Sequence, residues 1–308
     1  MNLQQLRALS VLADENFNIS KAAQLLCLTQ SATSKQLSQL EEALGVPLLQ
    51  RTSNRILGLT PIGEEVLQSA RVALGGAADI QRRVDDYRSV QSTTFSIATT
   101  HTHARYGLQQ AIRQFAQLHP DVSIHLVLAL PTDIAELVAA GKADMGVTSV
   151  PSSLPPTLIG LPCYPLHMGL VGHQRHPVFT QPSLGVADIA PYPLITYGDH
   201  HAIVQSIRTA FKQANQAFRA VVCSADVEVM KHYASIEVGL AVIPALAYDK
   251  DRDHLLQYRP LSHWLTPPLV RAIVRKDAYW PRHMYDFVEC VNPALSKRHI
   301  NQLLTRPA

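Results

Sequence analysis

The stretch ISKAAQLLCLTQSATSKQLSQLEEALGVPLLQRTSNRILGLTPIG, residues 19–63, decides how the first part of this 308-residue chain folds. A short helix over its first residues is followed by the break CLTQ and by a helix over residues 31–44. Gly45 is a good signal for the end of that helix. The alternating segment over residues 46–60 predicts a short β-ribbon, because apolar and polar side chains take turns along it.

Two further signals lie at the start of the chain. Leucines recur at helical spacing from Leu3 to Leu12 and predict one more helix before the quoted stretch. Asn18 or Ser20 can cap the helix that follows, since both side chains accept hydrogen bonds from free backbone amides. Three short helices and a ribbon predict an all-α winged helix-turn-helix domain over residues 1–60.

Residues 61–90 are predicted to form a linker and dimerisation helix, with Pro61 at an acceptable first-turn position. Apolar side chains alternate spacings of four and three along it, as they do where a helix packs on a partner helix. Gly75 and Gly76 each cost such a helix roughly 1 kcal/mol, which pairing would have to offset. The alternative is a helix that packs on its own domain. The predicted pairing residues are Val66, Ala70, Ala73, Ala77, Ile80, Val84 and Tyr87.

Beyond the linker SVQSTT, residues 89–94, predicted strands and helices alternate, and the first of these helices is predicted over residues 103–119. This order favours parallel sheets with right-handed crossovers, and a Pro-rich passage over residues 151–165 interrupts it. We therefore expect an α/β fold with two lobes around a ligand cleft, in the manner of the type 2 periplasmic binding proteins. The expected effector domain spans residues 91–308, with lobe I at about 91–162 and 266–308 and lobe II at about 163–265.

Composition gives weaker evidence about partners and location than the patterns above give about the fold. The formal net charge of +3 is too small to indicate a nucleic-acid partner without a local motif. The four widely spaced cysteines are expected to be reduced and mostly buried, as in cytosolic proteins. The opening MNLQQLRALS does not resemble a signal peptide, and no apolar run approaches the ~20 residues of a membrane span. A cytoplasmic protein without a membrane partner is expected.

The quoted stretch resembles the DNA-binding domain of LysR-type transcription regulators. Two positions depart from that family, because Ser31 replaces the usual Pro and Leu49 the usual Phe. The matching features are Ala22, Ala23, Leu25, Thr29, Gln30, Ser34, Lys35, Gln36, Leu40, Glu41, Leu44, Gly45, Leu48, Arg51, Leu59, Thr60 and Gly63.

The residue chemistry fits a helix that reads the major groove. Short polar side chains at its N-terminal end suit base edges, Gln30 or Gln36 can pair with adenine, and Lys35 can reach guanine or phosphate. The alternative is a solvated, protein-binding helix. The candidate DNA-binding residues are Thr29, Gln30, Ser31, Thr33, Ser34, Lys35, Gln36, Arg51 and Arg55.

The rest of the chain resembles the CysB-like branch of the same family through motifs such as IATTHTHARYGL and PTDIAELVAAGKAD. That resemblance implies control of sulfur assimilation genes and a small effector: sulfate, an acetylserine-like compound or an organosulfur compound. It also carries a ligand-contacting role to the hydroxyls of Thr100 and Thr102, although Ala202 replaces a ligand-binding Thr and His103 a usual Gln. The candidate effector-binding residues are Thr100, His101, Thr102, His103, Thr132, Ser149, His201 and Ala202.

Several alternatives remain at this point. One alternative is the same regulator fold sensing an unrelated small metabolite, because each Thr alone is also an ordinary helix cap. A metal site could use His101, His103, His200, His201 and Asp199. An enzyme is disfavoured since the usual catalytic motifs are missing from the sequence, and an exported solute-binding protein since it would leave residues 1–62 unexplained. No cofactor is expected. The expected partners are promoter DNA, the effector, RNA polymerase and further copies of the chain in a dimer or homotetramer.

Overall fold

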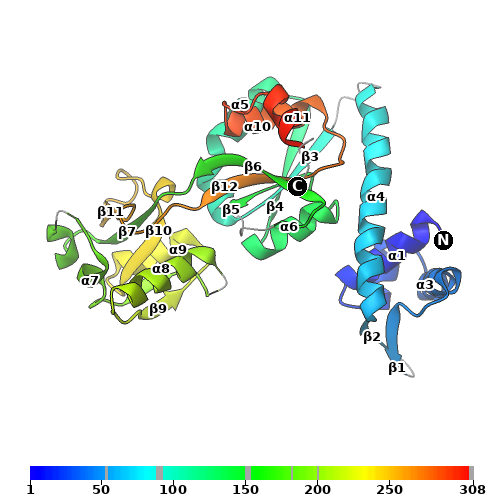
Figure 1. Cartoon of the computed structure of the whole chain (residues 1–308), viewed down its shortest axis with the longest axis horizontal. Coiled ribbons are helices and arrows are strands. Elements are labelled where there is room, and N and C mark those ends of the chain that lie inside the picture. Colours follow the sequence, from blue (N-terminus) through cyan, green and yellow to red (C-terminus); the bar gives the residue numbers. More distant parts are fainter. Residues whose placement is uncertain (53–54, 88–92, 150–153, 182, 200, 305–308) are drawn as a thin grey trace. The chain divides into compact units, whose positions relative to one another are not determined.

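The fold is taken from a computed structural model (Figure 1). Two compact units divide the chain: one built mainly from residues before position 88, the other mainly from residues after position 92. None of the helices within the described residues is long and apolar enough to cross a membrane. The structure describes residues 1–52, 55–87, 93–149, 154–181, 183–199 and 201–304.

The first unit holds three short helices, a two-stranded ribbon and one long helix (Figure 1). Asn18 caps the second helix, because its Oδ1 accepts from the amides of Ser20 and Lys21. Gly45 ends the third helix in the left-handed region, at φ 71°. The elements are α1 (Leu3–Asp14), α2 (Ile19–Leu25), α3 (Gln30–Leu44), β1 (Leu49–Thr52), β2 (Arg55–Leu59) and α4 (Pro61–Tyr87).

Helix α4 uses one side for its own domain. Ala70 is 3% exposed within the core cluster of α1, α3 and the ribbon, and Val66 packs against the same cluster. Those two predicted pairing residues are therefore corrected to core residues, because this part of α4 packs on α1 and turns them into that cluster together with Leu67 and Leu74 of the same helix. Farther along, Ile80 is 67% exposed. The side chain of Tyr87 lies outside the described part of the structure.

The second unit contains two lobes, each with a mixed five-stranded sheet. Lobe I orders its strands β4-β3-β5-β12-β6, with β3 parallel to β4 and β5 and with β12 antiparallel to its neighbours. The bounds are β3 (Thr93–Thr99), η1 (His103–Gly107), α5 (Gln109–Leu118), β4 (Val122–Leu128), α6 (Pro131–Ala139), β5 (Met145–Ser149), β6 (Leu158–Pro165), β12 (Leu269–Arg275), α10 (Arg282–Val291) and α11 (Lys297–Leu304).

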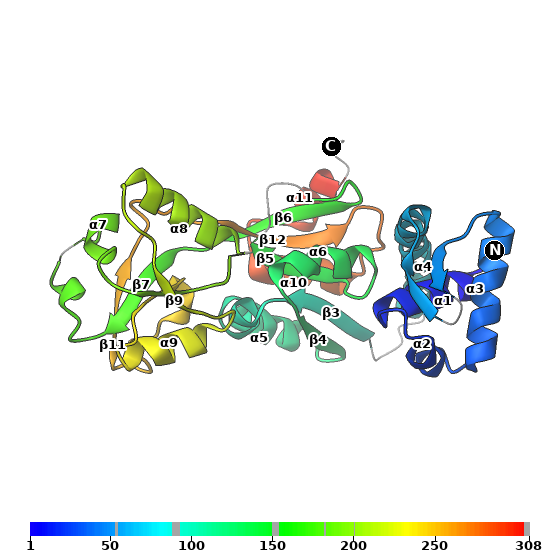
Figure 2. The same ribbon diagram turned by 90° about the horizontal axis from the view of Figure 1, so that it is seen from below.

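Lobe II repeats the strand–helix–strand plan. Its order is β11-β7-β10-β8-β9, with β8 parallel to both of its neighbours, and α8 and α9 cover opposite faces of this sheet (Figure 2). The bounds are β7 (Met168–His173), η2 (Pro177–Thr180), α7 (Val186–Ile189), β8 (Leu194–Thr196), α8 (Ala202–Gln213), β9 (Ala220–Cys223), α9 (Val227–Ser235), β10 (Leu240–Pro244), η3 (Ala245–Ala247) and β11 (Leu256–Pro260).

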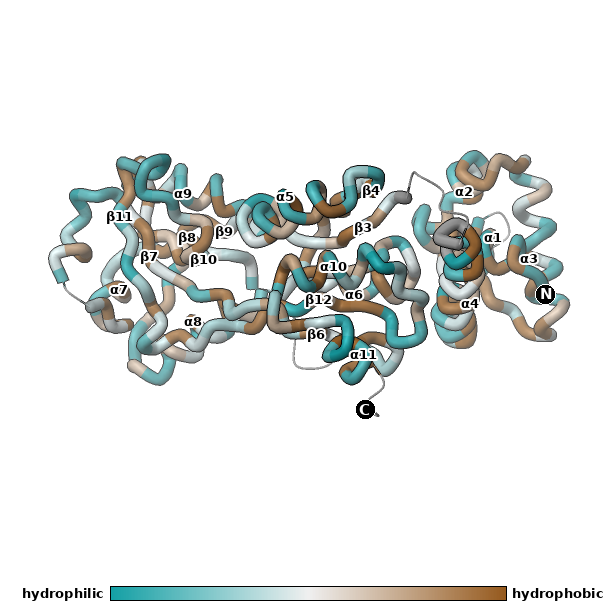
Figure 3. Tube along the Cα trace, turned by 90° about the horizontal axis from the view of Figure 1, so that it is seen from above, coloured by the Kyte–Doolittle hydropathy of each residue, from teal (hydrophilic) through white to brown (hydrophobic). Residues whose placement is uncertain are grey.

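The cores follow the strands. Hydrophobic stretches run along β3 and β7, whereas the helices alternate between hydrophobic and polar residues (Figure 3). Phe95 on β3 packs against Phe115 of α5 and Phe287 of α10, with ring centroids 5.8 and 5.2 Å away. Burial of such rings contributes to the stability of the lobe.

Three sequence expectations are corrected. The passage over residues 151–165 was expected only to interrupt the pattern, but Leu158–Pro165 forms the strand β6. This strand lies at the edge of its sheet, and its pairing with β12 shifts register beside Pro162. The missing amide of a proline is tolerated at such an edge. The helix predicted over residues 103–119 is divided into the π-helical turn η1 and α5. The sheets are mixed rather than parallel. Of the predicted linker, residues 89–92 lie outside the described part.

The cysteines also differ from the expectation. All four are free thiols, but Cys163 alone among them is buried, whereas Cys27 and Cys223 are exposed. They are spread over separate elements, and exposure does not change their expected reduced state.

Candidate functional sites

The first candidate site is the N-terminal end of α3. Thr29 caps this helix, since its Oγ1 accepts from the amide of Ala32, and Ser31 follows inside the first turn with its Oγ 3.0 Å from that hydroxyl. Gln30 donates to Ser20 Oγ at 2.8 Å, which joins α3 to α2. Lys35 is exposed one turn farther on. The exposed polar end therefore matches the surface that a groove-reading helix presents.

Thr33 does not belong to this surface. Its side chain is fully buried, and its hydroxyl donates to the carbonyl of Thr29 at 3.1 Å. The predicted base contact by Thr33 is corrected, because the residue shares the core face of α3 with Leu37 and Leu40. Ser34 and Gln36 are half-buried.

The ribbon carries the two predicted arginines. Arg51 pairs with Glu41 of α3 at 2.8 Å, and the same carboxylate accepts from the amides of Leu48 and Leu49. Glu41 therefore fixes the start of β1 against α3 and holds the guanidinium of Arg51 in place. Arg55 is exposed at the start of β2.

The second candidate site is a cavity of about 360 Å³ between the two lobes. Its walls come from the carboxyl ends of strands in both sheets, which is where open α/β sheets bind ligands. All eight candidate effector-binding residues line it. The lining is Thr100, His101, Thr102, His103, Leu128, Ala129, Leu130, Pro131, Thr132, Ser149, Leu166, Met168, Tyr197, His201, Ala202, Ile203, Ala225, Pro244 and Pro268.

The polar side of the cavity follows β3. Thr102 is 6% exposed, and His103 is 2% exposed with its Nδ1 2.9 Å from the phenol oxygen of Tyr164. Burial lowers the pKa of His103 to about 4, so its imidazole is neutral near pH 7. A Cβ at position 107 would collide with the same phenol, so Gly107 allows Tyr164 to lie at this distance from His103.

Tyr197 was missed by the sequence analysis. It follows β8 as Thr100 follows β3, and that matching position at a strand end was the available signal. Its ring stacks on His201 at 4.6 Å. Burial raises the pKa of its phenol, while a hydrogen bond with Thr102 acts in the opposite direction. Tyr197 thus connects the two lobes through the cavity.

The lining is neutral. Among the described residues that line the cavity there is no Lys, Arg, Asp or Glu. Apart from Ala202, ten of the nineteen lining residues are Leu, Ile, Met, Ala or Pro. An anion here would be held by hydroxyls, imidazoles and the free amides at the starts of α6 and α8. His200 lies outside the described residues, and the described ones contain no group of three side chains suited to a metal ion.

Comparisons with known proteins agree with this architecture. Residues 3–64 match the bacterial regulatory helix-turn-helix protein model of the LysR family, and residues 88–296 match the LysR substrate binding domain model.

Individual relatives cover nearly the whole chain. It is 34% identical to the HTH-type transcriptional regulator SsuR of Burkholderia cenocepacia over 99% of both chains, and 32% identical to CysB of the same species over 99% of this chain and 97% of that one. The solved cofactor-binding domain of the Cbl transcriptional regulator matches with a TM-score of 0.66 at 28% identity, covering 70% of this chain and 96% of that one. The chain belongs to the LysR family of DNA-binding transcription regulators, which are not enzymes, and carries its effector-binding domain.

Proposed function

We propose that this regulator senses a small organosulfur anion, of the sulfonate class, and controls promoters of sulfur or organosulfur assimilation genes. The observation that carries the proposal is the division of the cavity into a donor-rich polar end and a larger apolar remainder. A sulfonate has a permanently charged head for the first and a carbon chain for the second. The similarity to SsuR, CysB and Cbl supports a sensor of this branch.

The size of the cavity supports an organic ligand over inorganic sulfate. Its volume of about 360 Å³ falls in the range of roughly 300–1,000 Å³ that drug-sized ligands occupy. Leu128 and Leu130 line the cavity and are 47% and 42% exposed, so they would remain in contact with water around a bare sulfate ion, and covering such apolar surface is favourable. Ala202 also leaves the start of α8 without a side-chain hydroxyl, which frees space for a substituent.

The DNA-binding part of the proposal assigns base or phosphate contacts to Thr29, Gln30, Ser31, Ser34, Lys35, Gln36, Arg51 and Arg55. Copies of the chain would pair through the exposed side of α4, where Ile62, Ala73, Ile80 and Val84 follow one another at helical spacing. Paired heads would bind a site with matching half-site symmetry. A tetramer, a contact with RNA polymerase and a cytoplasmic location belong to the same proposal.

A thermal-shift screen of the full-length protein tests the effector class. Sulfate, thiosulfate, acetylserines and a series of alkyl and aryl sulfonates would be added in turn. A ligand at one hundred times its dissociation constant adds about 2.7 kcal/mol to the free energy of unfolding, which raises the melting temperature measurably. We expect the sulfonates to give the largest rise. A rise with sulfate or acetylserine and none with any sulfonate would refute the proposal.

A further inference from the structure

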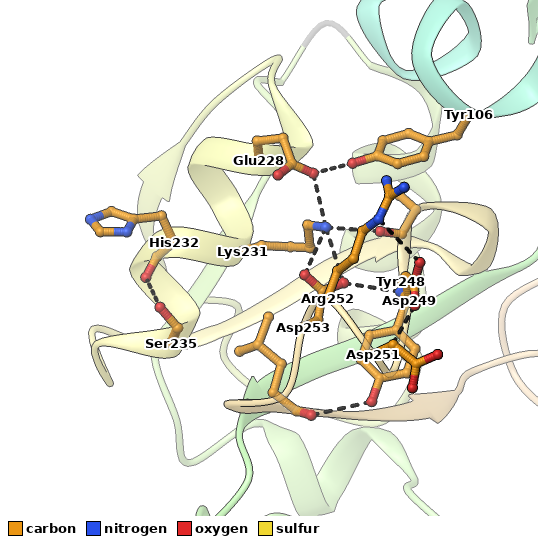
Figure 4. Close-up of polar contacts among 12 residues, drawn as sticks. Tyr106, Glu228, Lys231, His232, Ser235, Tyr248, Asp249, Asp251, Arg252 and Asp253 are labelled. Carbon is orange, nitrogen blue, oxygen red and sulfur yellow. Dashed lines mark hydrogen bonds and ion pairs between the residues drawn. The ribbon is translucent and has the colours of Figure 1, made fainter. Parts of the chain in front are cut away.

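A cluster of charged residues lies beside the cavity and joins the two lobes (Figure 4). Its centre is Lys231 on α9, whose Nζ lies 2.8 Å from Glu228 Oε1 and 3.0 Å from Asp253 Oδ1. The same ammonium donates to the carbonyl of Ala247 at 3.1 Å. The side chain of Lys231 is 8% exposed, so these partners replace most of its water.

Lobe II supplies more negative than positive charge to this cluster. Within this lobe, the ammonium of Lys231 is paired with two carboxylates, those of Glu228 and Asp253. Lobe I supplies groups that complement this negative charge. The phenol of Tyr106 donates to Glu228 Oε1, and the guanidinium of Arg105 lies 3.7 Å from Glu228 Oε2. Figure 4 shows Tyr106 reaching Glu228 from a different part of the chain than α9. The two lobes are thus complementary at this point.

The lobe I side of this contact is directly connected to the cavity. Tyr106 lies in η1, three residues after His103 and four after Thr102, which line the polar end. On the lobe II side, Ala247 follows Pro244 of the cavity lining by three residues. A displacement of Tyr106 relative to Glu228 would therefore move the polar end away from the lobe II wall.

We infer that Tyr106 is a positioning residue for effector binding, and that its hydrogen bond to Glu228 holds the two walls of the cavity at their binding distance. The carboxylate of Glu228 is already fixed in position within lobe II, because it is paired with Lys231. A ligand that touches both walls binds the state in which they are close, so its apparent affinity scales with the population of that state. The inference rests on the proposed function only in taking the cavity as the effector site.

Hydrogen–deuterium exchange of the full-length protein tests the hydrogen bond between Tyr106 and Glu228, here called the tether, without any ligand. Tyr106→Phe removes the donor and keeps the ring. Tyr248→Phe is the matched control, since that phenol donates to the carbonyl of Leu256 within lobe II. We expect faster exchange in Tyr106→Phe at residues 101–108 and 226–236, and no change at residues 101–108 in the control. Glu228→Gln, which keeps an acceptor oxygen but loses the charge, should lie between wild type and Tyr106→Phe.

Binding of pentanesulfonate to the same variants completes the test. We expect up to about tenfold weaker binding in Tyr106→Phe and an unchanged constant in Tyr248→Phe, since tenfold corresponds to 1.4 kcal/mol. Equal exchange in Tyr106→Phe and wild type, or the same lobe I change in the control, would overturn the inference. If pentanesulfonate binds none of the proteins, the proposed effector class fails, while the exchange comparison still decides on the tether.

Discussion

The two walls of the cavity differ in kind. Lobe I presents most of the hydroxyls and imidazoles, around the end of β3 and beside Leu128 and Leu130, whereas lobe II presents the stacked rings of Tyr197 and His201 beside apolar side chains. Directed donors fix the position of a charged head, and apolar surface selects the group attached to it. We therefore expect the regulator to recognise an anion through the donors of lobe I and to distinguish among anions through the apolar side chains of both lobes.

The greatest change that we expect is a loss of folding stability at low pH, because the lobe I wall contains a buried, neutral imidazole. The folded protein holds His103 at a pKa of about 4, whereas an unfolded chain would protonate it near 6.5. Between these values the unfolded state binds more protons, so stability falls as pH is lowered through this window, by up to roughly 3 kcal/mol. Urea titrations of wild type and His103→Gln from pH 7 to pH 4 would measure it. An equal pH dependence in both proteins would contradict a buried neutral imidazole.

The next effect removes a donor from the same wall. Thr102→Val should weaken sulfonate binding by about 2 kcal/mol, or roughly thirtyfold, because it leaves the charged head and the phenol of Tyr197 without a hydroxyl. Promoter affinity without effector should not change. Thr209→Val is the control, since that exposed hydroxyl on α8 does not line the cavity and donates to the carbonyl of Gln205 at 2.8 Å. Calorimetric titration of the two variants would separate them, and equal losses would show that the wall does not act through Thr102.

How far the sequence predicts these walls depends on the kind of residue. Thr100, Thr102 and Ser149 could be assigned because they lie at the carboxyl ends of predicted strands, and the resemblance to the CysB-like branch carries a ligand-contacting role to the first two. Met168 and Pro244 could not be, because apolar residues at strand ends look like core residues until the lobes are placed together. Thr33 was assigned to DNA on polarity alone, although its spacing from Leu37 and Leu40 marks the buried face of α3. The strand β6 was missed because Pro162 argues against a strand and only its edge position permits one.

A smaller effect concerns the apolar part of the cavity. Leu130→Ala should weaken pentanesulfonate binding by about 1 kcal/mol and leave methanesulfonate unaffected, since a short chain does not reach the removed carbons. Leu130 is 42% exposed, so its replacement costs little folding stability. Leu118→Ala, at an exposed leucine that does not line the cavity, is the control. Equal losses for both sulfonates would place the carbon chain elsewhere.

The smallest effect lies outside the sensor. Lys35→Ala should weaken promoter binding roughly threefold and reduce the magnitude of the salt slope by about 1, as expected for one lost phosphate contact. Lys212→Ala, an exposed lysine on α8, should leave both quantities unchanged. Fluorescence anisotropy with a labelled promoter at several salt concentrations measures both. An unchanged promoter affinity and an unchanged salt slope in Lys35→Ala would remove Lys35 from the DNA-binding surface.

We propose that the effector is a sulfonate whose head is bound by lobe I and whose carbon chain is bound by the apolar part of the cavity. Calorimetric titration of the full-length protein with pentanesulfonate, inorganic sulfate and hexanoate tests it most directly. We expect pentanesulfonate to bind most tightly, sulfate to bind weakly and the carboxylate to bind least. Tight binding of sulfate alone, or no difference between the sulfonate and the carboxylate, would contradict it.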